Sequence, residues 1–145
     1  MERVAALGLD VGKKRIGVAG CDGTGLIATG LTTIERTTFE EDVQQLKNLI
    51  EERQVEVLVI GFPYSMDGSI GFQAKHVQKF SRRLEKILQL PIEFMDERLS
   101  SVEAEIQLKE QKRFSSYNKG LIDQQAAQII LQQWLDQRRF NSIYV

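Results

Sequence analysis

The order in which two residue patterns follow one another limits the fold of this chain more than any other feature. The first part holds three apolar, strand-like segments, 4–11, 15–21 and 26–35, separated by short turns that contain glycine. Segments joined so closely pair as antiparallel neighbours. Later segments alternate between strand and helix, a pattern typical of parallel strands covered by helices. We therefore expect an α/β fold with a mixed five-stranded sheet, an antiparallel three-strand meander plus parallel strands, flanked by helices.

Capping residues and apolar stripes place the helices. Thr38 is followed three residues later by Glu41, the spacing of a capping box, so a helix is predicted to begin there. The other predicted elements are helices over 73–88, from Ser100 onward and over 121–136, strands over 55–62 and 92–97, and a loop over 111–120. The residues expected to face the core are Val77, Phe80, Leu84 and Ile87 in the helix at 73–88, and Ile122, Ala126, Ile130, Leu131 and Trp134 in the last helix.

Length and composition narrow the class of protein. A chain of 145 residues, 42% hydrophobic and 27% charged, is expected to form one globular domain over 1–145. No apolar run approaches the roughly 20 residues that span a bilayer, and the start of the chain lacks the apolar segment of a signal peptide, so we expect a cytoplasmic protein without membrane contact. One cysteine and one histidine exclude a tetrahedral Cys/His zinc site. Any metal would have to be held by oxygen.

The net charge of the chain is −1, so the protein as a whole does not attract nucleic acid. Any nucleic acid would have to be bound by local patches of basic residues. The first candidate patch is Lys13, Lys14 and Arg15, which follows a predicted strand and would lie beside a bound phosphate. Other short basic clusters occur at 82–83, 109–113 and 138–139. Such clusters also commonly do no more than solvate a surface.

Two carboxylates lie at strand ends. Asp10 ends a segment that is otherwise apolar, where an isolated charge would cost several kcal/mol unless it is paired or bound to metal. The ordinary alternative is an aspartate held by hydrogen bonds from the following turn at Gly12. Glu97 ends the strand predicted over 92–97, and its ordinary alternative is an ion pair with Arg98. The two strand ends could direct both carboxylates to one point.

Asp123 lies in the first turn of the last predicted helix. Ala126 and Ala127, three and four residues later, are small residues on the side that packs against the sheet, so this carboxylate is expected to point inward. A favourable interaction with the helix dipole would also explain an aspartate here. Three such carboxylates, with no catalytic histidine or cysteine, suit Mg²⁺ or Mn²⁺, and two ions could together promote phosphodiester hydrolysis.

The segment GFPYSMDGS at 61–69 is a strand end that runs into a loop at the predicted site. Ser65 and Ser69 are candidates for phosphate binding, and an aromatic residue of this loop could stack on a base. A loop with a purely structural role explains the segment about as well. Arg98 and Lys119 complete the residues assigned here to substrate binding.

Four strings in this order resemble the bacterial YqgF family of Holliday junction resolvase or pre-16S rRNA nuclease proteins: GLDVGKKRIGVA at 8–19, GFPYSMDGS at 61–69, DERLSSVEA at 96–104 and IDQQAA at 122–127. The resemblance covers nearly the whole chain. It implies a ribonuclease H-like fold, a metal-dependent nuclease, and an acidic triad of Asp10, Glu97 and Asp123. It also implies that the chain trims the 5′ end of the small-subunit rRNA precursor in ribosome biogenesis, with RNA favoured over DNA and pre-ribosomal particles as possible partners.

One departure from the family lies in the loop, where Leu-Pro-Leu-Asn is usual and this chain has FPYS at 62–65. Three alternatives stay open. The older family proposal is resolution of branched DNA, for which a dimer would cut two strands symmetrically, and oligomeric state is not readable here. A second is a non-catalytic RNA-binding or ribosome-binding protein. The third, an actin-like ATP-binding protein, is disfavoured because such proteins need two lobes.

Overall fold

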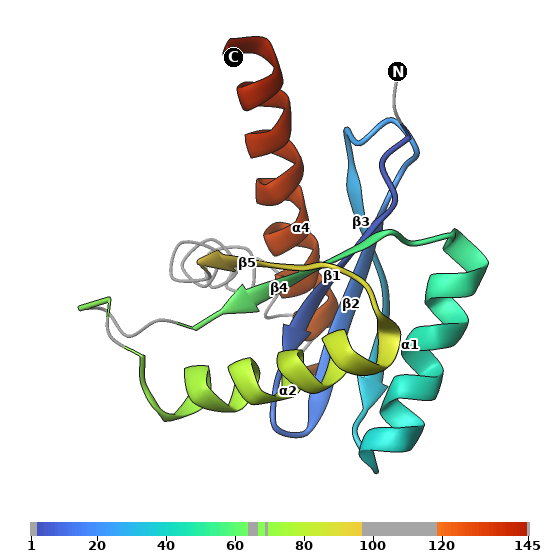
Figure 1. Cartoon of the computed structure of the whole chain (residues 1–145), viewed down its shortest axis with the longest axis vertical. Helices are drawn as coiled ribbons and strands as arrows, with labels where there is room; N and C mark the ends of the chain where they lie inside the picture. Colours follow the sequence, from blue (N-terminus) through green and yellow to red (C-terminus); the bar gives the residue numbers. More distant parts are fainter. Residues whose placement is uncertain (1–2, 64–66, 69, 97–118, 145) are drawn as a thin grey trace.

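The computed structural model describes residues 3–63, 67–68, 70–96 and 119–144, and it confirms the order of the predicted strands and helices that fall within these ranges. Five strands form one sheet in the order β3-β2-β1-β4-β5 (Figure 1). The elements are β1 (Ala6–Val11), β2 (Arg15–Cys21), β3 (Ala28–Glu35), α1 (Phe39–Arg53), β4 (Val57–Phe62), α2 (Phe72–Leu88), β5 (Ile92–Asp96) and α4 (Lys119–Tyr144).

The sheet is mixed, as predicted. β1, β2 and β3 pair as an antiparallel meander, whereas β4 lies parallel to β1, and β5 parallel to β4. Leu9 pairs with Ile60, and Phe62 pairs with Asp96. Because these three strands run in the same direction, their carboxyl ends meet at one edge of the sheet, the edge at which Asp10 lies.

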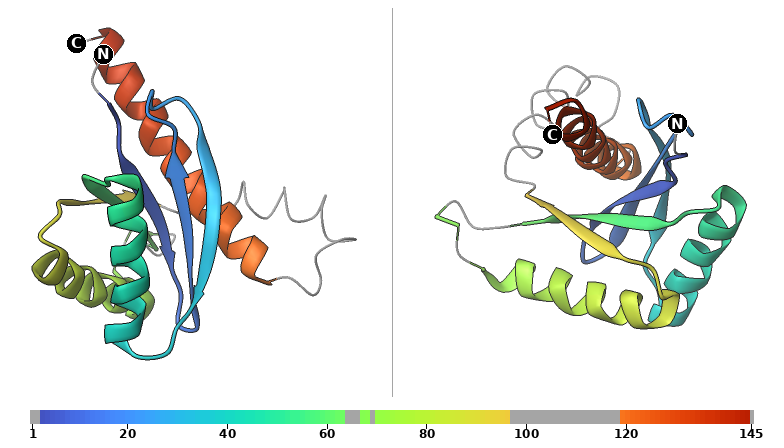
Figure 2. Two further views of the ribbon diagram at one scale, coloured as in Figure 1. Left: turned by 90° about the vertical axis from the view of Figure 1, so that its right-hand side faces the viewer. Right: turned by 45° about the horizontal axis from the view of Figure 1, so that its top comes forward.

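Helices cover both faces of the sheet. α1 and α2 lie on one face and α4 crosses the other (Figure 2). Leu7 and Leu9 of β1 belong to the core under α1 and α2, whereas Ala6 packs with α4 on the opposite face. This alternation is the period of two expected for a strand, and each fully buried aliphatic side chain contributes about 1.5–3 kcal/mol.

The cap of α1 and the core-facing residues of α2 agree with the predictions, with one exception. Thr38 caps α1, because its Oγ1 accepts a hydrogen bond from the N–H of Glu41 at 3.2 Å. In α2, Val77, Phe80 and Leu84 are buried as predicted. The prediction for Ile87 was wrong, since this residue is 47% exposed. The buried stripe of α2 runs through 74, 77, 81 and 84, and the helical repeat carries it to 88 instead of 87.

α4 is longer than the predicted helix, with bounds of Lys119–Tyr144 against 121–136. Ile130, Leu131 and Trp134 are buried against the sheet as predicted, whereas Ile122 and Ala126 are only half-buried. The last two residues of the predicted loop over 111–120 belong to this helix. Within the described ranges, no helix combines the length and the apolar character needed to cross a membrane.

Candidate functional site

Asp10 lies on the face of the sheet that α4 covers. Its neighbours in β1, Leu9 and Val11, are buried on the opposite face. Gly8, two residues earlier, faces α4, because a Cβ atom added there would lie 2.7 Å from the Cβ of Leu131. The period of two then places the Asp10 side chain on the same face as Gly8.

Gly17 brings Asp123 to Asp10. Asp10 pairs with Gly17 across the β1–β2 hairpin. A Cβ atom at position 17 would lie 2.0 Å from the backbone oxygen of Asp123, so only glycine allows α4 to come this close to β2. The inward orientation predicted for Asp123 agrees with this contact. Sequence reasoning missed the role of Gly17, although a glycine between buried strand residues, opposite Asp10, signals close backbone approach.

Hydrogen bonds to β3 and to the residues just before it hold α4 in place on either side of this contact. Thr33 donates its hydroxyl to the backbone oxygen of Gly120 at 2.5 Å, one turn before Asp123. Farther along, the Gln132 side chain accepts from the N–H of Ala28 at 2.8 Å and donates to the backbone oxygen of Leu26 at 2.9 Å. These bonds fix the register of α4 over the sheet and thereby the position of Asp123.

The Asp10 carboxylate is in an unfavourable environment for its charge. Burial, and next the negative charge of Asp123, raise the pKa of Asp10 from 3.8 to about 6. Among the residues that the structure describes, none donates a hydrogen bond to this carboxylate. The N–H of Gly12, which could have capped it, instead donates to the backbone oxygen of Arg15 at 2.9 Å. Asp10 therefore lacks the turn hydrogen bonds that would explain it as a purely structural residue.

Arg15 contacts Asp123. From the sequence it was predicted to bind the substrate instead. Its Nε donates to Asp123 Oδ2 at 2.6 Å, and this bond, with the charge of Asp123, raises the pKa of Arg15. Arg15 faces α4 because it lies two residues before Gly17 in β2. The hairpin register was the signal that could have predicted this pair.

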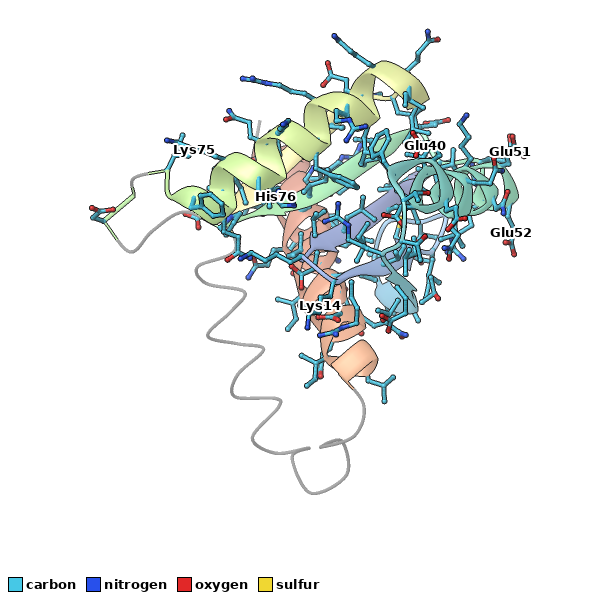
Figure 3. The ribbon with its side chains drawn as sticks, turned by 90° about the horizontal axis from the view of Figure 1, so that it is seen from below. Lys14, Glu40, Glu51, Glu52, Lys75 and His76 are labelled. Atoms are coloured by element: carbon cyan, nitrogen blue, oxygen red, sulfur yellow. The ribbon has the colours of Figure 1, made fainter. Side chains whose placement is uncertain are left out.

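Lys13 and Lys14 lie exposed in the β1–β2 turn, as the patch prediction expected. The turn is held by Arg36, whose Nη1 donates to the backbone oxygen of Gly12 at 2.7 Å and whose N–H donates to that of Lys14 at 2.9 Å. Arg36 is in turn paired with the buried Asp42 at 3.5 Å. In Figure 3, Lys14 lies between the start of α2, marked by His76, and the first turns of α4. The basic turn follows Asp10 in the chain and leads into Arg15, which contacts Asp123, so it borders the two carboxylates.

Several predicted site residues lie outside the described residues: Glu97, Arg98, Ser65 and Ser69, together with the helix predicted from Ser100. Lys119 is described only as the first residue of α4. Within the part of the chain that is described, no group of three carboxylate, histidine or cysteine side chains is arranged to hold a metal ion. The described part of the site is the pair Asp10 and Asp123 with its basic border.

Two solved structures of proteins that act on Holliday junctions share this fold. Thermus thermophilus RuvC in complex with a Holliday junction substrate matches with a TM-score of 0.54 and 11% identity, over 94% of this chain and 96% of that one. The yeast mitochondrial Holliday junction resolvase matches with a TM-score of 0.57 and 12% identity, over 99% of this chain and 85% of that one. At such identities the likeness shows the fold alone, and it confirms the expected ribonuclease H-like architecture.

Relatives with similar sequences share the full length of the chain. Proteins named "Putative pre-16S rRNA nuclease" are 73% identical in Rippkaea orientalis, over 96% of this chain and all of that protein, and 73% identical in Crocosphaera subtropica, over 99% of this chain and all of that protein. The family model described as "RuvX: Holliday junction resolvase" matches residues 4–137. The chain therefore belongs to the RuvX family, as the resemblance of its four strings implied.

Proposed function

We propose that this chain is a divalent-metal-dependent nuclease that hydrolyses phosphodiester bonds in RNA, with the 5′ end of the pre-16S rRNA as its substrate in ribosome biogenesis. The observation that carries the proposal is the placement of Asp10 and Asp123 together, from a strand and a helix 113 positions apart, on the covered face of the sheet. Two carboxylates that influence each other's charge are costly to keep ionised in a buried site unless a cation lies between them.

The two carboxylates fit a hard divalent ion. Asp10 has no hydrogen-bond donor among the described residues, and its raised pKa reflects burial and the charge of Asp123. A bound cation offsets both effects, and carboxylate oxygens are the ligands that Mg²⁺ and Mn²⁺ prefer. When bound, such an ion supplies activation of water and stabilisation of the leaving oxygen in phosphodiester hydrolysis.

Glu97 is the proposed third ligand. Met95, two residues earlier, packs in the core under α4 on the same face as Gly8 and Asp10. Continued alternation along the chain predicts that face for Glu97 too. The site would then combine the ends of β1 and β5 with the second turn of α4.

The residues of the site divide the remaining work. Lys13 and Lys14 carry exposed positive charge at the border of the site and are proposed to bind the phosphates that flank the cut. Arg15 fixes the Asp123 carboxylate through its 2.6 Å hydrogen bond. Ser65, Ser69, Arg98 and Lys119 remain proposed substrate contacts.

RNA is proposed over DNA because relatives that are 73% identical over almost the whole chain carry a pre-16S rRNA nuclease name. Cleavage of branched DNA is the second candidate, and it is favoured by the description of the family model. A protein that binds RNA without cutting it is the third. One panel of substrates separates all three.

The test is cleavage of an RNA that spans the 5′ end of the 16S precursor, and of a four-way DNA junction, with Mg²⁺ or Mn²⁺. Asp10→Asn, Glu97→Gln and Asp123→Asn are expected to abolish RNA cleavage while the chain stays folded. Asp136→Asn, which changes an exposed aspartate of the same helix as Asp123, is the matched control and should cut normally. Cleavage of the junction alone would favour the resolvase. Triad variants that cut RNA like the parent would overturn the proposed metal site.

A further inference from the structure

α2 carries a concentration of positive charge that the proposed site does not use. Its sequence FQAKHVQKFSRRLEKIL holds five lysine or arginine residues and one glutamate, in a chain whose net charge is −1. The helix lies on the face of the sheet opposite to α4 (Figure 2). A local field of this size favours an anionic partner at α2.

Four of the five cations form one row on the outer side of the helix. The residues of α2 that face the core are Ala74, Val77, Phe80, Ser81 and Leu84. We use the name cation ladder for Lys75, Lys79, Arg82 and Lys86. Their spacing of i, i+4, i+7 and i+11 puts these four side chains on the side of the helix opposite to the core, and all four are exposed. In Figure 3, Lys75 projects from α2 away from the sheet, whereas His76 lies on the side of the β1–β2 turn.

The ladder is electrostatically unfavourable in the protein alone. Lys75 and Lys79 are like charges at i and i+4, as are Arg82 and Lys86, and such pairs destabilise a helix. The first turn of α2 has no acidic residue to offset the lysines there. No described residue forms an ion pair with any member of the ladder. A partner that supplies several negative charges in a row would relieve this repulsion.

The ladder starts beside the candidate site. Lys13, in the turn that follows Asp10, places its Nζ 5.7 Å from the centre of the Phe72 ring at the first residue of α2. That ring is 80% exposed. An exposed aromatic ring between the basic turn and the ladder is a suitable platform for a nucleobase.

We propose that the cation ladder binds the phosphate backbone of the nucleic acid whose cleavage is proposed above, as the strand passes from the site around the edge of the sheet and along α2. The inference rests on the proposed function for the identity of the strand. From Lys75 to Lys86 the ladder rises about 16 Å in steps of about 4.5–6 Å, which suits a chain of regularly spaced phosphates. An acidic protein segment fits less well, because the exposed aliphatic side chain of α2, Ile87, lies at the end of the helix and none lies along the row from Lys75 to Lys86.

The test is binding of a fluorescein-labelled single-stranded RNA, followed by anisotropy in EDTA over a series of KCl concentrations. Lys79→Gln/Arg82→Gln is compared with Arg138→Gln/Arg139→Gln. The control removes the same charge from the basic cluster at 138–139, which lies about 22 Å along α4 from Asp123 and is therefore expected to be beyond the bound strand. Each lost phosphate contact lowers the slope of log K against log salt by about 0.7, so the ladder variant should lose about 1.4 and the control almost nothing. Neutralising all four ladder residues should lower the slope by about 2.8 and the affinity by about tenfold or more.

Equal slopes and affinities for the ladder variant and the control would overturn the proposal, and the ladder would then serve another anionic partner. Thermal unfolding of each variant checks the fold, and Lys79→Gln alone, with an expected slope change of about 0.7, substitutes for any variant that does not fold. Because binding is measured without metal, it is independent of cleavage. A parent that binds through the ladder without cutting RNA would sink only the proposed function, and a parent that cuts without using the ladder would sink only this inference.

Discussion

Arg15 holds the Oδ2 atom of Asp123 at 2.6 Å, so one proposed metal ligand is shared with a cation of the chain itself. The two side chains come from β2 and from the second turn of α4, because this helix begins at Lys119 and not at the predicted 121. They are 26% and 20% exposed. At this exposure the ion pair adds little to stability, since solvent screens it. The main effect of the Arg15–Asp123 pair is to orient the Asp123 carboxylate beside Asp10.

Replacement of Arg15 should therefore separate stability from activity. Arg15→Gln is expected to leave the urea midpoint of unfolding nearly unchanged and to lower RNA cleavage, because solvent screens the ion pair but Asp123 loses the donor that orients it. Urea denaturation and cleavage rates measure the two effects. Arg139→Gln, which breaks the exposed pair with Asp136, is the control and should change neither. Parental cleavage by Arg15→Gln would contradict an orienting role.

The raised pKa of Asp10 predicts a pH-dependent stability in the metal-free chain. The pKa of Asp10 is about 6 in the folded chain and has its ordinary value of 3.8 in the unfolded chain, so the folded chain binds the proton more tightly. The resulting stability is fully present below about pH 4 and is lost as pH rises through about 6, at a cost of roughly 1–3 kcal/mol. Asp10→Asn should be more stable than the parent at about pH 7.5 and equal to it at about pH 4, by urea denaturation in EDTA.

Asp22 provides a control of opposite sign. A hydrogen bond from the Thr24 hydroxyl, and next the N–H of Ile27, lower the pKa of Asp22. Its stabilising effect is therefore present above the ordinary pKa and lost as pH falls. Asp22→Asn should lose stability relative to the parent at neutral pH and approach it in acid. If Asp10→Asn follows that pattern too, the environment assigned to Asp10 is wrong.

The sequence predicted the elements well because their signals are local. The Thr38 cap needs only a few neighbouring residues, and it was confirmed. Ile87 shows the limit of such reasoning: a stripe tolerates 87 or 88 at its end, and contacts with the sheet decide which residue is buried. The length of α4 depends likewise on contacts that no local pattern contains.

The site was only partly predictable, because its geometry depends on residues distant in sequence. Small neighbours predicted an inward Asp123, yet its proximity to Asp10 requires Gly17, which pairs with Asp10 and contacts the helix. Arg15 was assigned to phosphate from its place in a basic run. Its partner is an aspartate 108 positions away, and a local charge pattern cannot identify such a partner.

Divalent metal should stabilise the folded chain. An ion that binds only the folded state at about ten times its dissociation constant adds about 1.4 kcal/mol to the free energy of unfolding. Thermal unfolding should therefore shift upward with Mn²⁺ or Mg²⁺ and return on addition of EDTA. Asp123→Asn should show no such shift, whereas Asp136→Asn should shift like the parent. An equal shift in both variants would place the bound ion elsewhere.

Gly17→Ala should damage the fold and the site together. The added Cβ would lie 2.0 Å from the backbone oxygen of Asp123, so α4 must move away from β2. Overpacking against backbone predicts a loss of about 3 kcal/mol or more, with a drop in RNA cleavage at temperatures where the variant is still folded. Gly23→Ala is the matched control, because the atom nearest to its added Cβ is 4.0 Å away. A Gly17→Ala chain as stable and active as Gly23→Ala would show that Asp123 need not approach β2 so closely.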